Sequence, residues 1–117
     1  MNLTADTLFS ALSHEIRLRS LLLMQAQGEL CVCELTHALG LSQPMISRHL
    51  ALLREAGLVS DRRAGVWIYY TINPALPDWA KAVLSVSAEG VQTQTPFSTD
   101  RQALLDMPNR PGARCCA

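Results

Sequence analysis

The stretch from residue 42 to residue 57 constrains the fold more than any other part of this chain. Ser42 is a good N-cap for a helix, and Pro44 falls in the first turn, where proline is tolerated because the amide hydrogen it lacks has no helical partner. Apolar residues then recur at helical spacing, at Ile46, Leu50 and Leu53. The sequence therefore predicts a helix that buries one face and ends near Gly57.

Three more helices are predicted before this one. Apolar positions favour helices over roughly 3–12, 13–28 and 31–39, and Ser13 is the expected N-cap of the second. The second helix is the most apolar, so it is expected at the centre of the core. Only a glycine and a leucine separate the third helix from Ser42, which predicts a tight turn between the two helices.

A β-hairpin and a fifth helix are predicted next. Residues 58–63 and 66–72 resemble two strands around a glycine-containing turn, and the second strand is rich in β-branched and aromatic residues. Pro74 and Pro77 then introduce a helix that should run to about residue 88.

The C-terminal part of the chain is predicted to be looser. From Gly90 the sequence turns polar and resembles a linker. A capping-box pattern at 99–102 predicts a short final helix that Pro108 stops. We therefore expect two parts, a folded domain over 1–91 and a C-terminal tail over 92–117.

Composition bounds the class of protein. The 117 residues suffice for one core, and 49% hydrophobic with 17% charged residues is typical of a globular chain. No apolar stretch reaches the ~18 residues of a membrane span, and no secretory signal is visible, so we expect no membrane association and a cytoplasmic location. The net charge is zero, but Arg48, Arg54, Arg62 and Arg63 can still make one face basic.

Helix, short turn, helix and hairpin is the order of a winged helix-turn-helix, whose second helix enters the DNA major groove. Ser47 is small and faces outward, so a base edge can approach, and Arg48 can reach a guanine or a phosphate. Arg62 and Arg63 lie at the hairpin tip, where a basic wing touches phosphates, whereas His49 lies near the inward edge of its helix. The alternative is a generic small domain with a solvated turn. The candidate DNA-contacting residues are Ser42, Gln43, Ser47, Arg48, His49, Arg62 and Arg63.

Four cysteines occur as two close pairs, Cys31 with Cys33 and Cys115 with Cys116. In a reducing compartment such pairs favour metal binding or redox chemistry over structural disulfides. On a regular helix Cys31 and Cys33 would point about 200° apart, but a residue at the helix start is free of that restriction. The helix N-terminus also favours the thiolate that binds metals. The alternative is a pair of half-buried structural cysteines.

The tail pair has no core to fill. Cys115 and Cys116 could form a ligand arm or a redox pair, or their adjacency could be accidental. We favour the ligand arm, because a flexible tail can bring thiols to a site at modest entropic cost.

These motifs together resemble the ArsR/SmtB family of bacterial winged-helix metal-responsive repressors, over residues of about 5–90. The run 29–33, Glu-Leu-Cys-Val-Cys, resembles the thiol signature of the arsenic-responsive members, and the run 42–54 resembles their recognition helix. The resemblance implies a homodimer that represses an arsenic-resistance operon. It also implies release of the DNA when trivalent arsenic or antimony binds.

Two departures from the family pattern matter. Many arsenic-responsive members carry a third cysteine where this chain has Thr36, so the local site is one thiolate short, and Cys115 or Cys116 could supply it. Met45 stands where a basic residue is common, which puts one DNA contact in doubt. The carboxylate and histidine site of the zinc-sensing members is not expected, because none of the three histidines lies on the last core helix.

We therefore predict a mainly α-helical, dimeric winged helix-turn-helix with a small β-hairpin, whose dimer contact lies on the first and last core helices. It would be a repressor of operator DNA, not an enzyme, that responds to As(III) or Sb(III) and needs no organic cofactor. The expected metal ligands are Cys31, Cys33, Cys115 and Cys116. Four sulfurs would also suit cadmium, lead or zinc, and a thiol-redox repressor remains a third reading. A thiol-dependent reductase is disfavoured, because no C-x-x-C lies near a βαβ pattern.

Overall fold

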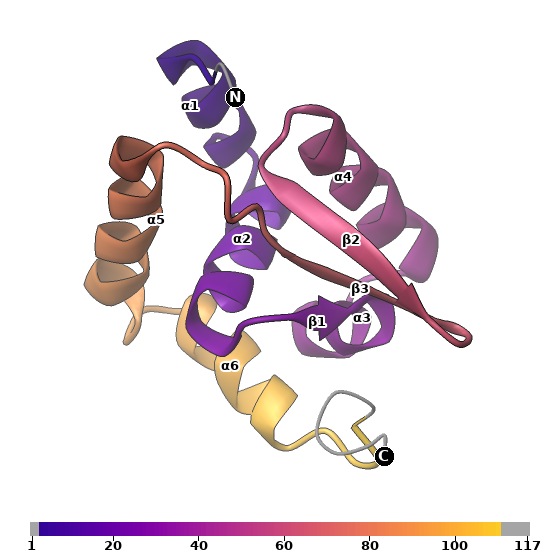
Figure 1. Cartoon of the computed structure of the whole chain (residues 1–117). Helices are drawn as coiled ribbons and strands as arrows, with labels where there is room; N and C mark the ends of the chain where they lie inside the picture. The colour runs from indigo at the N-terminus through magenta and orange to yellow at the C-terminus, as the bar shows by residue number, and fades with distance from the viewer. Residues whose placement is uncertain (1–2, 111–117) are drawn as a thin grey trace.

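The computed structural model describes residues 3–110. Within them the chain forms a helical domain with one three-stranded antiparallel sheet of order β1-β3-β2 (Figure 1). The elements are α1 Ala5–Leu12, α2 Glu15–Gln27, β1 Leu30–Cys31, α3 Val32–Leu39, α4 Gln43–Glu55, β2 Val59–Ala64, β3 Trp67–Ile72, α5 Asp78–Val91 and α6 Phe97–Leu105. This arrangement confirms the predicted winged helix-turn-helix.

Helix α2 is the centre of the core, as its apolar sequence predicts. Its residues 20–24 are all buried, and α1, α4, α5 and α6 pack around it (Figure 1). Ser20 is the one polar residue of that run, and its hydroxyl donates to the Ile16 carbonyl oxygen at 2.8 Å. That hydrogen bond satisfies the hydroxyl within its own helix, so the residue is buried at little cost.

The start of α2 differs from the prediction. The N-cap is His14, not Ser13, and the His14 Nδ1 atom accepts a hydrogen bond from the Ile16 amide at 3.2 Å. Ser13 has right-handed helical dihedrals (φ −77°, ψ −10°) and closes α1, whereas His14 has the extended backbone (φ −102°, ψ 127°) that an N-cap requires. The short connection gives the capping role to the second of the two residues.

The sheet contains a strand that the sequence does not predict. The hairpin strands β2 and β3 pair in register from Val59 with Ile72 to Ala64 with Trp67, as expected. In addition, β1 pairs with the far edge of β3, placing Leu30 opposite Tyr70 and Cys31 opposite Tyr69. A strand of two residues carries no alternation of apolar and polar positions, so pattern analysis cannot find it.

The chain beyond α5 folds back onto the domain. Gly90 lies within α5, so the predicted linker shortens to residues 92–96. Helix α6 begins at Phe97, earlier than the capping-box pattern indicates, and ends before Pro108 as predicted. Its residue Leu104 is fully buried, and the helix packs against α3 and α2. Residues 97–105 are therefore part of the core.

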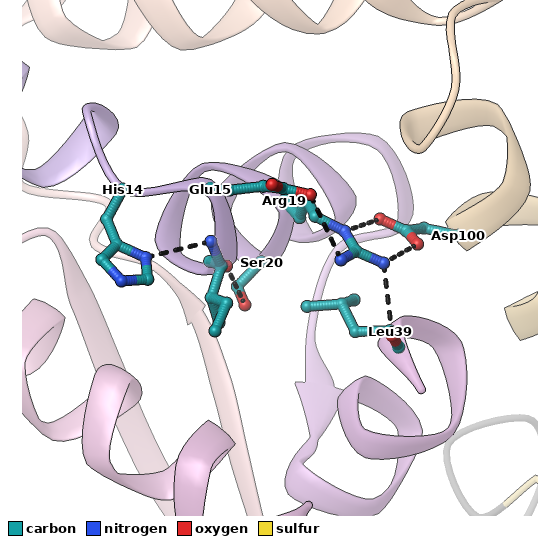
Figure 2. A network of polar contacts seen from close by, with 7 residues as sticks. His14, Glu15, Arg19, Ser20, Leu39 and Asp100 are labelled. Atoms are coloured by element: carbon teal, nitrogen blue, oxygen red, sulfur yellow. Dashed lines mark hydrogen bonds and ion pairs between the residues drawn. The ribbon is translucent and has the colours of Figure 1, made fainter. Parts of the chain in front are cut away.

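A buried ion pair fixes α6 in place (Figure 2). Arg19 of α2 donates from Nε and Nη2 to the two carboxylate oxygens of Asp100 at 2.8 and 2.7 Å. The same Nη2 atom donates to the Leu39 carbonyl oxygen, at the end of α3, at 3.2 Å. Asp100 is only 2% exposed, and its hydrogen bond raises the pKa of Arg19 further above its ordinary value. One side chain thus joins three helices.

Asp100→Asn tests this junction. The change removes the charge that compensates Arg19 inside the protein, and losing one partner of a buried pair costs about 3 kcal/mol. We expect the urea midpoint to fall accordingly, while Asp106→Asn, at an exposed position just after α6, shifts the free energy of unfolding by less than about 0.5 kcal/mol. Equal effects of the two changes would contradict the role given to the pair.

Candidate nucleic-acid interface and metal centre

Helix α4 begins and packs as the sequence predicts. The Ser42 hydroxyl accepts from the Met45 amide at 3.4 Å, and the apolar stripe from Ile46 to Leu53 is buried. Gly40 ends α3 with a left-handed backbone (φ +69°), which lets the chain turn within two residues. The turn sets α3 and α4 against each other as the two helices of a helix-turn-helix.

The start of α4 presents a polar surface. Gln43 and Arg48 are exposed, and Ser47 is half-buried. The Gln43 side-chain amide donates to the Ser47 hydroxyl at 2.7 Å, so the two side chains hold each other on one face. Together with Ser42, four of the predicted DNA-contacting residues therefore share the first turns of the helix.

His49 faces the protein rather than this surface. It is 6% exposed, its ring lies 4.4 Å from the ring of His14, and its Nδ1 is 3.5 Å from Nη1 of Arg17. Burial first, and then the positive neighbours His14, Arg17 and Arg48, lower the pKa of His49 from its ordinary value. The His49 side chain therefore extends from α4 toward the start of α2.

The lowered pKa predicts a pH-dependent contribution to stability. On acidification the unfolded chain binds the His49 proton before the folded chain does, so the contribution is present above about pH 6.5 and lost as the pH falls through the folded value. His49→Gln should make the free energy of unfolding fall less steeply between pH 7 and 5, roughly the range in which a histidine titrates. His37→Gln, at an exposed position on α3, is the control. Equal slopes for both variants and the wild type would contradict the prediction.

The wing arginines differ from each other. Arg63 is exposed near the left-handed Gly65 (φ +64°) at the hairpin tip, and makes no ion pair with any residue of 3–110. Arg62 is exposed too, but its Nε and Nη2 donate to the two carboxylate oxygens of Glu29 at 2.6 and 2.7 Å. The Glu29 contact was not anticipated from the sequence, because 33 positions separate the two residues.

The two N-terminal cysteines lie at the start of α3. Cys31 is the N-cap, with an extended backbone (φ −86°, ψ 165°), and Cys33 is in the first turn. Because Cys31 is not helical, the opposed directions expected of residues two apart on a helix do not apply. Burial, followed by the interaction with the Cys33 thiol, raises the pKa of Cys31 to about 12. Burial thus outweighs the helix N-terminus, which was expected to favour the thiolate.

A buried carboxylate supports this site. Glu34 is fully buried, and its Oε1 atom accepts from the Cys31 amide at 2.8 Å. Its Oε2 atom accepts from Nε of Arg110, which lies beyond α6. A glutamate three residues after an N-cap is a capping-box signal, but cysteine is not a usual cap, so the sequence reading missed it. Nothing in the sequence indicates Arg110.

The position of Arg110 bears on the tail cysteines. Cys115 and Cys116 lie outside the described residues. Cys115 is five residues after Arg110, and an extended chain of that length spans at most about 17 Å. Chain length therefore allows both thiols to reach Cys31 and Cys33 of the same subunit.

The described residues do not form a complete metal site by themselves. Across 3–110, no three side chains of histidine, cysteine, aspartate or glutamate come together to hold an ion. Cys31 and Cys33 are two soft donors, suited to a thiophilic metal or metalloid, and further ligands would have to come from elsewhere. In the same part of the chain, no helix is long and apolar enough to cross a membrane.

The sequence is similar to those of known bacterial regulatory proteins. Residues 14–61, from the cap of α2 into β2, match the family described as bacterial regulatory protein, arsR family. An arsenic resistance transcriptional regulator of Pseudomonas putida is 50% identical over 109 residues, which cover 93% of this chain and 84% of that protein. The chain belongs to the ArsR family. It is accordingly an ArsR-type helix-turn-helix repressor, not an enzyme.

Two solved structures of similar sequence agree with the fold. HlyU from Vibrio cholerae is similar with a TM-score of 0.64 at 36% identity, over 73% of this chain and 88% of that one. The antimony-specific transcriptional repressor AntR is similar with a TM-score of 0.61 at 27% identity, over 73% of this chain and 74% of that one. Both similarities extend well beyond the recognition helix.

Proposed function

We propose that this chain is a homodimeric repressor that leaves its operator when trivalent arsenic or antimony binds Cys31, Cys33 and a tail cysteine. The observation that carries the proposal is the position of Cys31, the N-cap of the helix that braces α4. A ligand bound there pulls on the element that positions the DNA-reading helix. Because the protein would act on operator DNA, we expect it in the cytoplasm.

The chemistry fits a three-thiol site. Arsenite is As(OH)₃ in neutral water, and each As–S bond forms as one hydroxide leaves arsenic with the thiol proton as water, without oxidation or reduction. Thr36 offers no sulfur, and its hydroxyl donates to the Val32 carbonyl oxygen at 2.8 Å. Cys31 and Cys33 would supply two bonds, and Cys115 or Cys116 the third. The antimony-specific name of AntR supports the same class of ligand.

DNA binding would use α4 and the wing. Gln43, Ser47 and Arg48 would enter the major groove, where Arg48 can contact a base edge or a phosphate. Arg63 would touch backbone phosphates from the hairpin tip. Release would follow from movement of α3, because α3 packs against α4 and is joined to it by the short turn at Gly40.

A homodimer would rest on α1 and α5. Large apolar side chains are exposed on both helices: Phe9 on α1, and Trp79 and Val86 on α5. Burying them against a second copy of the chain would remove apolar surface from water and set two recognition helices at successive turns of the DNA. Sedimentation velocity should therefore give the mass of a dimer, and a monomeric species that still repressed would count against this arrangement.

The DNA interface is tested by two arginine changes. Arg48→Ala should lower affinity for the operator by roughly 1–3 kcal/mol and relax its sequence preference. Arg63→Ala should weaken binding to all duplexes alike and reduce the salt slope by about one unit. Arg101→Ala removes the same charge from α6 and is the control. Fluorescence anisotropy across a salt series makes the measurement, and three identical responses would exclude a specific role for α4.

The thiol site is tested by serine replacement. Cys31→Ser and Cys33→Ser should keep operator affinity and abolish release by arsenite, because serine retains size but lacks the soft donor. Cys115→Ser and Cys116→Ser should each have a small effect, and the double change a large one. X-ray absorption should then find three sulfur neighbours of arsenic in wild type, and two in the double variant. Unchanged release after loss of Cys31 and Cys33 would exclude the site.

A gain-of-function control sharpens the tail experiment. Thr36 is three residues after Cys33 on α3, so the two side chains lie on one face of the helix. Thr36→Cys, made in the variant that lacks both tail thiols, should restore three-sulfur binding and arsenite response. Cadmium, zinc and peroxide should be tested in the same assay. If only one of them released the operator DNA, that agent and not arsenite would be the signal.

A further inference from the structure

One ion pair connects the cysteine strand to the wing across an intervening strand. In the sheet order β1-β3-β2, β1 and β2 are not neighbours. Arg62 of β2 nevertheless reaches Glu29, the residue before β1, with two hydrogen bonds at 2.6 and 2.7 Å. The Arg62 side chain therefore passes over β3 to make this contact.

Tyr69, over which the Arg62 side chain passes, lies in the same row of the sheet as Cys31 and Arg62. Tyr69 of β3 is the register partner of both Cys31 and Arg62, so the three side chains share one face. The Arg62 guanidinium lies 4.8 Å from the centre of the Tyr69 ring, and Tyr69 is buried. Glu29 is two residues from Cys31 along an extended chain, so it faces the same way. A continuous row thus runs from the thiol of Cys31 to the wing.

We propose that Glu29 and Arg62 are positioning residues that couple the thiol site to the wing. Binding of a metalloid at Cys31 moves β1 together with Glu29, which directly precedes it. Arg62 follows Glu29 and turns β2, so the wing and α4 lose their DNA contacts together. This inference rests on the proposed inducer site at Cys31 and adds a second route from that site to the DNA.

The geometry gives this pair more weight than an ordinary surface ion pair. Exposed pairs contribute little because each charge exchanges with water. Here the contact is bidentate and the guanidinium is stacked on an aromatic ring, which restricts the side chain before it pairs. Glu29 also occupies two donors of Arg62 that a phosphate would otherwise use, so in this state Arg63 is the better placed of the two for DNA.

Glu29→Gln tests the coupling, because it keeps the size of the side chain and removes the charge. The readout is the ratio of operator affinities without and with saturating arsenite, alongside arsenite affinity measured without DNA. We expect the ratio to fall by roughly 3- to 10-fold while arsenite affinity stays unchanged. Arg62→Gln should lower the ratio to a similar extent.

The chain supplies a matched control. Asp61, the neighbour of Arg62 on β2, makes an exposed ion pair with Arg54 of α4 at 2.8 Å, away from β1. Asp61→Asn removes the same charge from the wing side and should leave the ratio as in wild type. The exchanged pair, Glu29→Arg with Arg62→Glu, should restore much of the ratio, which loss of DNA-binding charge alone cannot explain.

The outcomes separate the inference from the function beneath it. If neither Glu29→Gln nor Asp61→Asn changes the affinity ratio, and the protein still releases DNA with arsenite, the coupling alone is overturned. Weaker binding by Arg62→Gln to every duplex with no change in the ratio makes Arg62 a simple phosphate contact and also overturns it. Wild-type protein that neither binds arsenite nor releases DNA overturns the proposed function, and the coupling with it.

Discussion

The contact between Arg19 and Asp100 holds the arrangement on which the candidate site depends (Figure 2). Taking both charges out of water costs free energy. The attraction between them offsets this cost only when α6 lies against α2. The Nη2 atom of Arg19 donates both to Asp100 and to the Leu39 carbonyl oxygen, and it thereby also fixes where α3 ends. Because only three residues separate α3 from α4, the position of the recognition helix depends in turn on α6.

Helix α3 is therefore held at both ends by groups connected to the C-terminal part of the chain. At its end, Arg19 binds the Leu39 carbonyl oxygen while pairing with Asp100. At its start, Glu34 accepts from the Cys31 amide and from Arg110. A ligand that draws further chain toward Cys31 acts on a helix that is already restrained on both sides. We expect a helix held at both ends to move as a unit, and transmission of the signal to α4 requires this.

The sequence predicts the parts of this structure that local physics decides. The cap of α4, its buried stripe and the hairpin follow from short-range patterns, and all three are confirmed. The contacts that organise the candidate site join distant positions: Arg62 with Glu29, and Arg110 with Glu34. A single sequence carries no signal for such pairs, since an arginine on an exposed strand looks the same with or without its partner. The His14 cap was missed because two adjacent residues could each cap α2, and only the backbone decides between them.

The protonation of Cys31 bears on which ion the site favours. A divalent cation that binds buried thiols must release their protons to solvent, so a thiol pKa raised to about 12 weakens such binding at neutral pH. Arsenite and antimonite are neutral hydroxides, and each hydroxide takes up the proton of the thiol that replaces it. For these ligands the burial of Cys31 carries no such penalty, and it keeps competing water from the new bond. At the proposed site, we therefore expect the buried Cys31 thiol to suit a metalloid hydroxide better than zinc or cadmium.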